Sequence, residues 1–154
     1  MSDIVDKQTR SRMMSGIRSR DTSPELIIRK GLFRRGFRYR LHVGNLPGKP
    51  DLVLPRYNAI ILVNGCFWHG HDCHLFKWPK SRESFWRKKI GDTKRRDSDN
   101  LRRYREMGWR VATVWECSVR DENTADISNK LEILSEWLHG NSQSLDMANI
   151  SYWR

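Results

Sequence analysis

The sequence predicts an α/β protein of the α+β kind, in which helices flank a mixed sheet of four strands. The main observation is the order of the elements along the chain, which is helix, three strands, helix, strand and helix. A strand–helix–strand return favours a parallel pair within a mixed sheet that helices cover. The chain has 154 residues, of which 38% are apolar, and this suffices for one small hydrophobic core.

Capping residues, periodicity and turns place the elements of the first half of the chain. A helix begins at residues 22–25, where a hydroxyl cap precedes a proline and an acid, and it ends near Gly36. Apolar and basic residues alternate over 37–42, which is typical of a half-buried strand. After a turn-rich loop, residues 51–54 predict a second strand, and the apolar run 59–63 predicts a third strand that returns beside it.

The second half of the chain predicts two helices around a fourth strand. Residues 93–107 carry apolar side chains on one helical face, and Gly108 closes this helix. The fourth strand covers residues 109–117. Residues 124–138 repeat isoleucine and leucine every three or four positions, which indicates an amphipathic helix packed on the core.

The positive charge of the chain is unevenly distributed. The net charge is +11 and the pI is about 10.1. Residues 1–40 carry eleven basic and four acidic residues (+7), and residues 77–110 carry thirteen and five (+8), whereas residues 116–139 carry two and six. Such segregation favours a polyanionic partner, most simply nucleic acid, over an anionic membrane surface.

The two ends of the chain differ in composition from the middle. Residues 1–20 are polar and basic, and they form either an arm that orders on nucleic acid or an amphipathic helix packed on the body. Met14, like Met13, is a candidate wedge residue, because unbranched apolar side chains enter base steps from the minor groove. We therefore expect an N-terminal arm over 1–20, a main domain over 21–140 and a C-terminal tail over 141–154.

No segment of the sequence predicts export or membrane insertion. No apolar run approaches the roughly 20 residues of a membrane-spanning helix, and the first residues lack the apolar core of a signal peptide. We expect an intracellular, cytoplasmic protein.

The segment 64–74 is the most informative part of the chain, because it holds two of the three cysteines and three of the five histidines. Thiolate and imidazole ligands this close together suit a tetrahedral zinc ion. Cys66, His71 and Cys73 supply three ligands, and Cys117, at the end of the fourth predicted strand, supplies the fourth if that strand lies beside the third. The alternative is a disulfide, which would leave one cysteine unpaired and needs an oxidising compartment.

Two further residues near this segment suggest catalysis. His69 is not needed for zinc, and an imidazole beside a metal cluster in a basic protein is a candidate general base, although a lone histidine is commonly a satisfied polar residue. Asp51 begins the second strand, and an antiparallel hairpin would bring it near the carbonyl oxygen of Val63. These two oxygens are a candidate magnesium site; the alternative for Asp51 is a role in a turn or cap.

These residues together give the chain a resemblance to the very short patch repair endonucleases. It spans about Asp6 to Leu138 in one register and lies in Thr9-Arg10-Ser11, Arg20-Asp21-Thr22, Pro50-Asp51, Asn64 to His69, His71, Cys73, Arg96-Asp97, Gly108 to Val111 and Trp115-Glu116-Cys117. The resemblance implies a variant of the restriction-endonuclease-like fold. It also implies a magnesium-dependent hydrolase of phosphodiester bonds that nicks double-stranded DNA 5′ to the thymine of a T:G mismatch left by deamination of 5-methylcytosine. Mismatch-repair proteins are a further candidate partner, and the expected state is a monomer.

The resemblance also implies roles for individual residues. Asp51 and the Val63 carbonyl would hold magnesium, while His69 would be the general base, oriented by Asp97. Glu25 would organise the water around magnesium. The zinc ligands would be the four residues named above, and the aromatic wedge at the mismatch would consist of Phe67, Trp68 and Trp86, with Met14 entering from the other groove. The chain has Val63 and Asn64 where the family commonly shows threonine and histidine.

Two other functions remain open at this point. A zinc-stabilised DNA-binding module without catalysis would need only the basic segments and the aromatic residues. A nuclease of the same fold with broader mismatch specificity would share all the residues named here.

Overall fold

The computed structural model describes residues 21–120 and 122–148, and these residues form an α+β fold around one five-stranded sheet. The strands lie in the order β1-β2-β3-β4-β5. The β1–β2 and β2–β3 pairs are antiparallel, whereas the β3–β4 and β4–β5 pairs are parallel. The predicted mixed sheet is therefore confirmed, with strands Arg40–Leu41 (β1), Leu52–Leu54 (β2), Ala59–Asn64 (β3), Arg110–Trp115 (β4) and Ser144–Met147 (β5).

The prediction of four strands was wrong by one, because β5 lies in the expected C-terminal tail. Its four residues alternate polar and apolar side chains, with Leu145 half-buried and Met147 buried on the core, but an alternation of only four residues is a weak strand signal. β5 forms because the edge of β4 offers a partner, with Val111 beside Ser144 and Val114 beside Met147. Pairing with a neighbour decides strand formation here more than residue preference does.

The first strand is also shorter than predicted. Residues 37–42 suggest a half-buried strand, yet β1 contains two residues, both exposed. Phe37 is buried in the core below α2 but precedes the strand. The alternation of residue types over this segment therefore reflects the packing of Phe37 and Tyr39 on the core rather than a continuous strand.

Within the described residues three α-helices cover the sheet, α2 (Ser23–Arg34), α3 (Glu83–Glu106) and α4 (Thr124–His139). The start of α2 is as predicted: Thr22 caps it by accepting a hydrogen bond from the Glu25 amide, and proline occupies its first turn. In contrast, α3 begins ten residues before the predicted position. Arg82 precedes it in a left-handed conformation without a side-chain cap, and Gly91 interrupts its pattern, so the usual signals of a helix start are missing.

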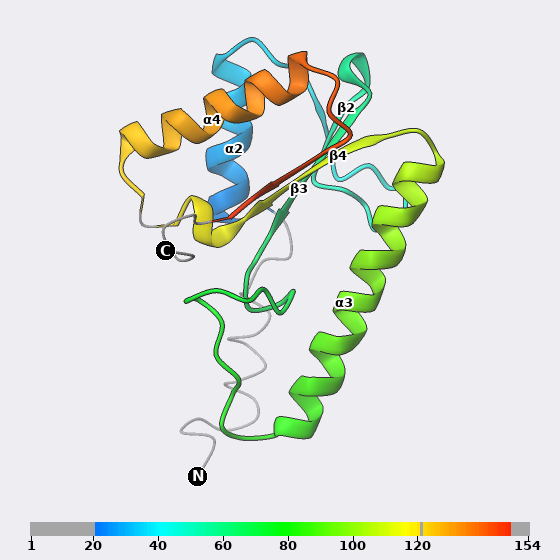
Figure 1. Cartoon of the computed structure of the whole chain (residues 1–154), viewed down its shortest axis with the longest axis vertical. Helices are drawn as coiled ribbons and strands as arrows, with labels where there is room; N and C mark the ends of the chain where they lie inside the picture. Colours follow the sequence, from blue (N-terminus) through cyan, green and yellow to red (C-terminus); the bar gives the residue numbers. More distant parts are fainter. Residues whose placement is uncertain (1–20, 121, 149–154) are drawn as a thin grey trace.

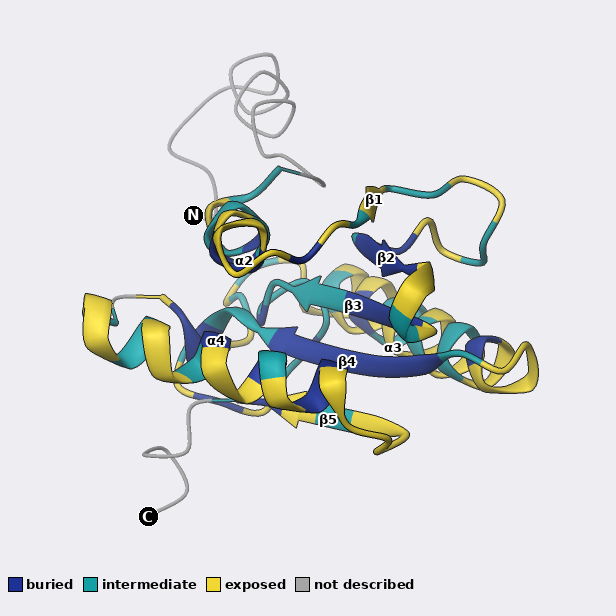
Figure 2. Ribbon diagram, turned by 90° about the horizontal axis from the view of Figure 1, so that it is seen from above, coloured by how far each residue is buried: buried dark blue, intermediate teal, exposed yellow. Residues whose placement is uncertain are grey.

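The helices divide the core into two layers, one on each face of the sheet. Figure 1 shows α2 and α4 together on one side of the strands and α3 on the other. The larger core cluster packs α2 and α4 on the sheet, and the smaller one packs Tyr104 of α3 on Val53, Ile60 and Val111. In Figure 2 the interior strand β4 is almost entirely buried while the outer faces of the helices are exposed. β3 and β4 end at Asn64 and Trp115, and both of these residues line the cavity described below.

Met14 and the expected arm over 1–20 lie outside the described residues, as do residues 149–154 of the tail. Among the described residues, no helix combines the length and the apolar character that crossing a membrane requires.

Candidate active site and metal centre

The parallel pairing of β3 and β4 brings the three cysteines together. Asn64 lies beside Trp115 at the ends of these strands. Cys66 and Cys117 each follow two residues later, so they lie on neighbouring segments of the chain. The Cys117 amide donates a hydrogen bond to Cys66 Sγ at 3.3 Å. The juxtaposition that the sequence predicted for Cys117 is therefore present, and the three cysteines form no disulfide.

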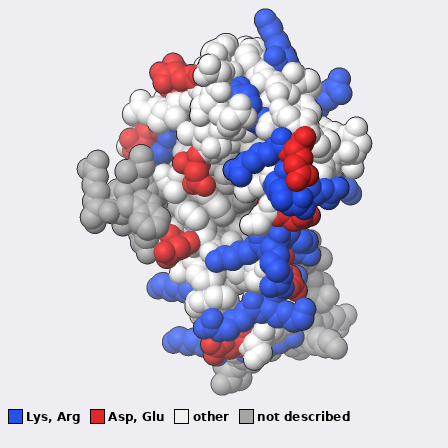
Figure 3. All heavy atoms as spheres, turned by 45° about the vertical axis from the view of Figure 1, so that its right-hand side comes forward, with Lys and Arg blue, Asp and Glu red and all other residues white. Residues whose placement is uncertain are grey.

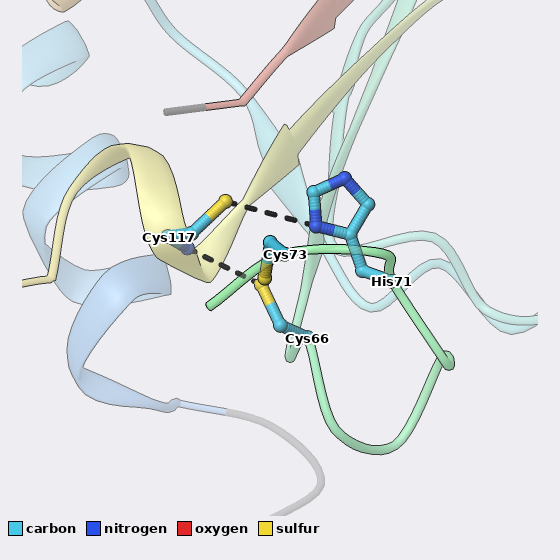
Figure 4. A group of neighbouring side chains, drawn as sticks. All are labelled: Cys66, His71, Cys73 and Cys117. Atoms are coloured by element: carbon cyan, nitrogen blue, oxygen red, sulfur yellow. Dashed lines mark hydrogen bonds between the residues drawn. The ribbon is translucent and has the colours of Figure 1, made fainter. Parts of the chain in front are cut away.

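The four predicted zinc ligands form a compact, buried cluster. The ligand atoms of Cys66, His71, Cys73 and Cys117 all lie within 4.8 Å of one another, and Figure 4 shows the four side chains converging on one point. Ligand atoms around tetrahedral zinc lie about 3.3–3.8 Å apart, given bonds of about 2.0–2.3 Å. The separation of 3.7 Å between Cys117 Sγ and His71 Nδ1 fits this geometry, so the cluster can hold a metal ion.

The protonation of the cluster also fits a cation. Burial raises the pKa of the Cys66 thiol; the hydrogen bond from the Cys117 amide opposes this rise, and the charge of Cys117 and the thiol of Cys73 add to it. Burial lowers the pKa of His71, which favours the neutral imidazole that binds metals. Three thiolates so close together need a positive ion to be stable, because like charges and desolvation both disfavour them.

Trp115 links this cluster to the edge strand of the sheet, and sequence reasoning missed this link. The Trp115 ring stacks on His71 with centroids 4.0 Å apart and an interplanar angle of 8°. Its Nε1–H donates to Asp146 Oδ2 at 3.3 Å. Trp115 was identifiable as the last residue of an apolar strand, but Asp146 gave no signal because β5 itself gave only a weak one.

His69 and Asp97 form a hydrogen-bonded pair beside the cluster. His69 Nδ1 lies 2.6 Å from Asp97 Oδ2, although the two residues come from the turn after β3 and from α3. With Nδ1 bound to the carboxylate, Nε2 is left as the proton acceptor. The close approach requires Gly70, which has a φ of +61°, and a Cβ there would lie 2.6 Å from Ile90 Cγ2.

Asp51 lies against the end of β3, as the predicted hairpin requires. The Val63 amide donates a hydrogen bond to Asp51 Oδ2 at 2.8 Å, so the observed contact is with the N–H of Val63, whereas the prediction named its carbonyl. Burial, assisted by the neighbouring Glu25 carboxyl, raises the pKa of Asp51 from 3.8 to about 7. A carboxyl group whose pKa lies near 7 is partly protonated at neutral pH, and it can lose this proton when a metal cation binds.

Glu25 is the centre of a second group of polar side chains. It is only 1% exposed, and its carboxylate accepts from the Asp21 amide at 2.8 Å and from Arg29 at 3.1 Å. His42 Nε2 lies 3.1 Å from its other oxygen. The ligand atoms of Asp21, Glu25 and His42 lie within 4.8 Å of one another. Sequence reasoning missed His42, whose positive φ of 47° is not readable from residue type.

The three predicted wedge residues lie together at the start of α3. The ring centroids of Phe67 and Trp68 are 5.2 Å apart, those of Phe67 and Trp86 are 5.3 Å apart, and those of Trp68 and Trp86 are 5.8 Å apart. Met14, the fourth predicted member, lies outside the described residues. The structure thus gathers three aromatic side chains from two segments into one surface.

One cavity of about 670 Å³ joins the catalytic candidates. Asp51, His69 and Asp97 all line it, together with His42, Asn64 and residues of β4 and β5. A carboxylate with a raised pKa and an oriented imidazole therefore face the same space. This arrangement offers a cation ligand and a proton acceptor to one reacting group.

Comparisons with known proteins identify the family of the chain. A family model described as DNA mismatch endonuclease Vsr matches residues 2–75. The DNA mismatch endonuclease Vsr of Escherichia coli strain K12 is 42% identical over 144 residues, which cover 94% of this chain and 92% of that protein. Two nicking enzymes are also similar, and each match covers 79% of this chain. V.XorIIP of Xanthomonas oryzae is 41% identical with 89% of its length covered, and V.NmeAIP of Neisseria meningitidis is 41% identical with 87% covered. The chain therefore belongs to the DNA mismatch endonuclease Vsr family.

Proposed function

We propose that the chain is a magnesium-dependent endonuclease that nicks double-stranded DNA 5′ to the thymine of a T:G mismatch left by deamination of 5-methylcytosine. The observation that carries the proposal is the shared cavity, which Asp51 and the His69–Asp97 pair line together. Membership of the mismatch endonuclease family supports the choice of substrate.

His69 and Asp97 supply the proton transfer. In this mechanism His69 Nε2 accepts a proton from the attacking water, and Asp97 fixes the tautomer and stabilises the imidazolium that forms. Magnesium, held by Asp51 and the Val63 carbonyl, would supply positive charge to the scissile phosphate. Glu25 holds Asp51 and the surrounding water in place from the buried side of the site.

The Cys–His cluster has a structural role in this proposal. Cys66, His71, Cys73 and Cys117 hold zinc with four protein ligands, which leaves no open position for substrate. The segment they enclose contains Phe67, Trp68 and His69. The cluster therefore keeps the general base and two wedge residues rigid relative to β3 and β4.

The aromatic side chains supply mismatch selectivity. Phe67, Trp68 and Trp86 enter the duplex beside the mismatch, and Met14 enters from the other groove. Opening a base step costs a few kcal/mol, and stacking on aromatic rings returns about 1–3 kcal/mol per base. A mismatched step costs less to open than a paired one, so insertion favours T:G over paired DNA.

The wider architecture fits the same function. The antiparallel β2–β3 hairpin, the parallel β4 and helices on both faces of the sheet support a restriction-endonuclease-like fold. The proposal assigns residues 1–20 to a DNA-binding arm, residues 21–140 to the nuclease domain and residues 141–154 to a tail whose first part adds β5 to the sheet. It describes a monomeric, cytoplasmic enzyme with mismatch-repair proteins as candidate partners.

The test is a cleavage panel of duplexes that carry T:G, each other mismatch or a paired base at one position, with and without added magnesium. We expect one nick, 5′ to the thymine, only in the T:G duplex and only with magnesium. Asp51→Ala should abolish the nick yet keep duplex binding. Asp99→Ala, an exposed acid on α3 that pairs with Arg102, is the matched control and should cleave like the wild type.

Two outcomes would replace the proposal. Tight duplex binding without scission, identical in the wild type and in Asp51→Ala, would identify a binding module. Cleavage of several mismatches at similar rates would identify a nuclease of broader specificity.

A further inference from the structure

Two arginines near the start of α3 place their guanidinium groups over exposed aromatic rings. Arg82 Cζ is 4.3 Å from the centroid of the Phe85 ring, and Arg87 Cζ is 4.3 Å from the centroid of a Trp78 ring. Phe85 and Trp78 are among the most exposed large apolar side chains of the described residues, at 43% and 40%. We call these two arginine–ring pairs the stacked arginines.

The stacked arginines lie at the two ends of the aromatic surface described above. On one side, Trp78 contacts Phe76 edge-on with centroids 5.0 Å apart, and Phe76 stacks on Phe67 at 5.8 Å. On the other side, Phe85 contacts Trp86 at 5.2 Å. A continuous run of ring contacts therefore connects one stacked arginine to the other through the proposed wedge.

The charge around this run is strongly positive. Residues 77–89 contain six basic residues and one acid, so their net charge is +5. Figure 3 shows lysine and arginine side chains gathered over α3. Arg87 donates through Nε to Glu83 at 2.8 Å, in a pair whose side chains are both more than half exposed. No carboxylate among residues 21–120 and 122–148 forms an ion pair with Arg82.

Stacking positions a guanidinium without consuming its hydrogen-bond donors. The five N–H groups lie in the plane of the group, so a ring against its face leaves them available for bidentate contact with an anion. Phosphate oxygens match this fork, and contacts with phosphate position a protein on duplex DNA without reading its sequence. Each ring therefore positions its guanidinium for contact with phosphate, and it can do so only because ring and arginine are exposed at the surface.

We propose that Arg82 on Phe85 and Arg87 on Trp78 are two preorganised phosphate contacts that hold the sugar–phosphate backbone of duplex DNA at the two ends of the aromatic wedge. This inference rests on the proposed function, because it takes the wedge to lie in DNA. It adds to that function the contacts that position the duplex: the stacked arginines hold its backbone in place while the rings between them separate the bases.

The experiment measures duplex affinity as a function of salt for Arg82→Gln and Arg87→Gln, with T:G and fully paired duplexes. Each lost phosphate contact should lower the slope of log affinity against log salt by about 0.9. The affinity ratio of wild type to variant should therefore shrink about 3.5-fold between 50 and 200 mM salt. The loss should be equal for both duplexes, since phosphate contacts carry no base information.

Three further variants separate stacking from charge. Trp78→Ala and Phe85→Ala should weaken binding to both duplexes while their arginines remain, because the guanidinium is no longer held. Arg82→Lys should keep the salt slope but bind less tightly, because an ammonium keeps the charge and loses the fork. Arg102→Gln is the matched control. Arg102 lies on the same helix but pairs with Asp99 and Glu106, so its loss should leave the slope unchanged.

The proposal fails if Arg82→Gln and Arg87→Gln keep the wild-type slope, or if they weaken only the T:G complex. Variants would be compared at equal zinc content and thermal stability, so that misfolding is not scored as lost contact. If the wild type binds duplex but cuts no mismatch, the proposed function fails while the slopes still decide the role of the arginines. If nicking persists with unchanged slopes, only the stacked arginines are refuted.

Discussion

Two groups of side chains that could hold a metal ion lie near the same end of the sheet, and they differ in donor atoms and in access. The first consists of Cys66, His71, Cys73 and Cys117, and its three cysteines are at most 5% exposed. The second consists of Asp21, Glu25 and His42 beside Asp51, and both His42 and Asp51 line the cavity. The first offers sulfur and nitrogen in a closed cluster, and the second offers mainly oxygen next to open space.

The difference in ligands indicates that the first group has a structural role and the second a chemical one. Soft ligands with full protein coordination favour a permanent ion, whereas oxygen ligands beside a cavity favour an exchangeable, hard cation. His69 lies between Cys66 and His71 of the first group in the sequence, lines the cavity beside the second group, and is held by Asp97 of α3. We therefore expect changes in the first group to destroy the fold of the site, and changes in the second to stop the reaction in an intact fold.

The largest effect should come from Cys117→Ser. Loss of one ligand should release zinc and lower the free energy of unfolding by more than about 4 kcal/mol, because metal binding and folding are coupled in structural sites. Nicking should fall to background, since the turn that carries His69 is no longer fixed. Elemental analysis of zinc per chain and thermal unfolding measure both effects.

Ser118→Ala is the control for this variant. Ser118 is fully buried, and its hydroxyl donates to the Trp115 carbonyl; losing that bond should cost only about 1 kcal/mol and no zinc. If Cys117→Ser retained one zinc per chain and wild-type stability, the closed cluster would not be the structural element of this site.

The closed cluster was largely predictable from the sequence, whereas the open group was predicted only in part, through Asp51 and Glu25 but not through Asp21 and His42. Cys117 could be placed beside Cys66 because a strand–helix–strand return fixes two parallel strands as neighbours. The pairing of Glu25 with His42 depends on a loop residue of positive φ, and that of Trp115 with Asp146 depends on an edge strand of only four residues. Contacts that follow from regular pairing can be read from residue order, whereas contacts through loops and edge strands depend on the folded surface.

The next effect concerns the proton acceptor. His69→Ala should lower the nicking rate about 10²–10⁴-fold, the usual contribution of a general base. Asp97→Asn should lower it as well, because the amide can donate to Nδ1 and select the wrong tautomer. Zinc content and thermal stability should stay near the wild-type values, which single-turnover nicking with magnesium and elemental analysis would establish.

Asp99→Asn tests whether any acid on α3 has this effect. Asp99 lies two residues from Asp97 but forms an exposed pair with Arg102. A nicking rate as low for Asp99→Asn as for Asp97→Asn would point to a general charge effect and remove the specific role of the His69–Asp97 bond.

A smaller effect should appear in the pH dependence of stability without added magnesium. The folded pKa of Asp51 is raised from 3.8 to about 7, first by burial and then by Glu25. A raised carboxyl pKa contributes stability that is complete below the unfolded value and is lost as the pH rises toward 7. The contribution of this group should change by at most about 1.4 kcal/mol per pH unit.

Asp51→Asn isolates this contribution. Between pH 5.5 and 8, chemical denaturation should show the wild type losing stability relative to Asp51→Asn, and Asp99→Asn should follow the wild type. Magnesium should stabilise the wild type more at pH 8 than at pH 6, because it binds the deprotonated carboxylate. Parallel curves of stability against pH for the wild type and Asp51→Asn would show that folding does not raise the pKa of Asp51.

The smallest effect should distinguish two glycines at the junction of the closed cluster and α3. Gly70 has a φ of +61° and lies against Ile90 and Lys94, whereas Gly91 is inside α3 and a Cβ there would meet only Arg95 Nη1 at 3.8 Å. Gly70→Ala should destabilise the protein by about 1–2 kcal/mol and slow nicking, because it strains the turn and pushes His69 away from Asp97. Gly91→Ala should instead stabilise it by about 0.5–1 kcal/mol, since alanine is the better helix former.

Thermal unfolding and nicking rates test this pair of variants. Opposite changes in stability, with slower nicking only in Gly70→Ala, would show that the contact between the turn and α3 holds His69 in position. Equal effects from the two substitutions would show instead that the position of His69 does not depend on that contact.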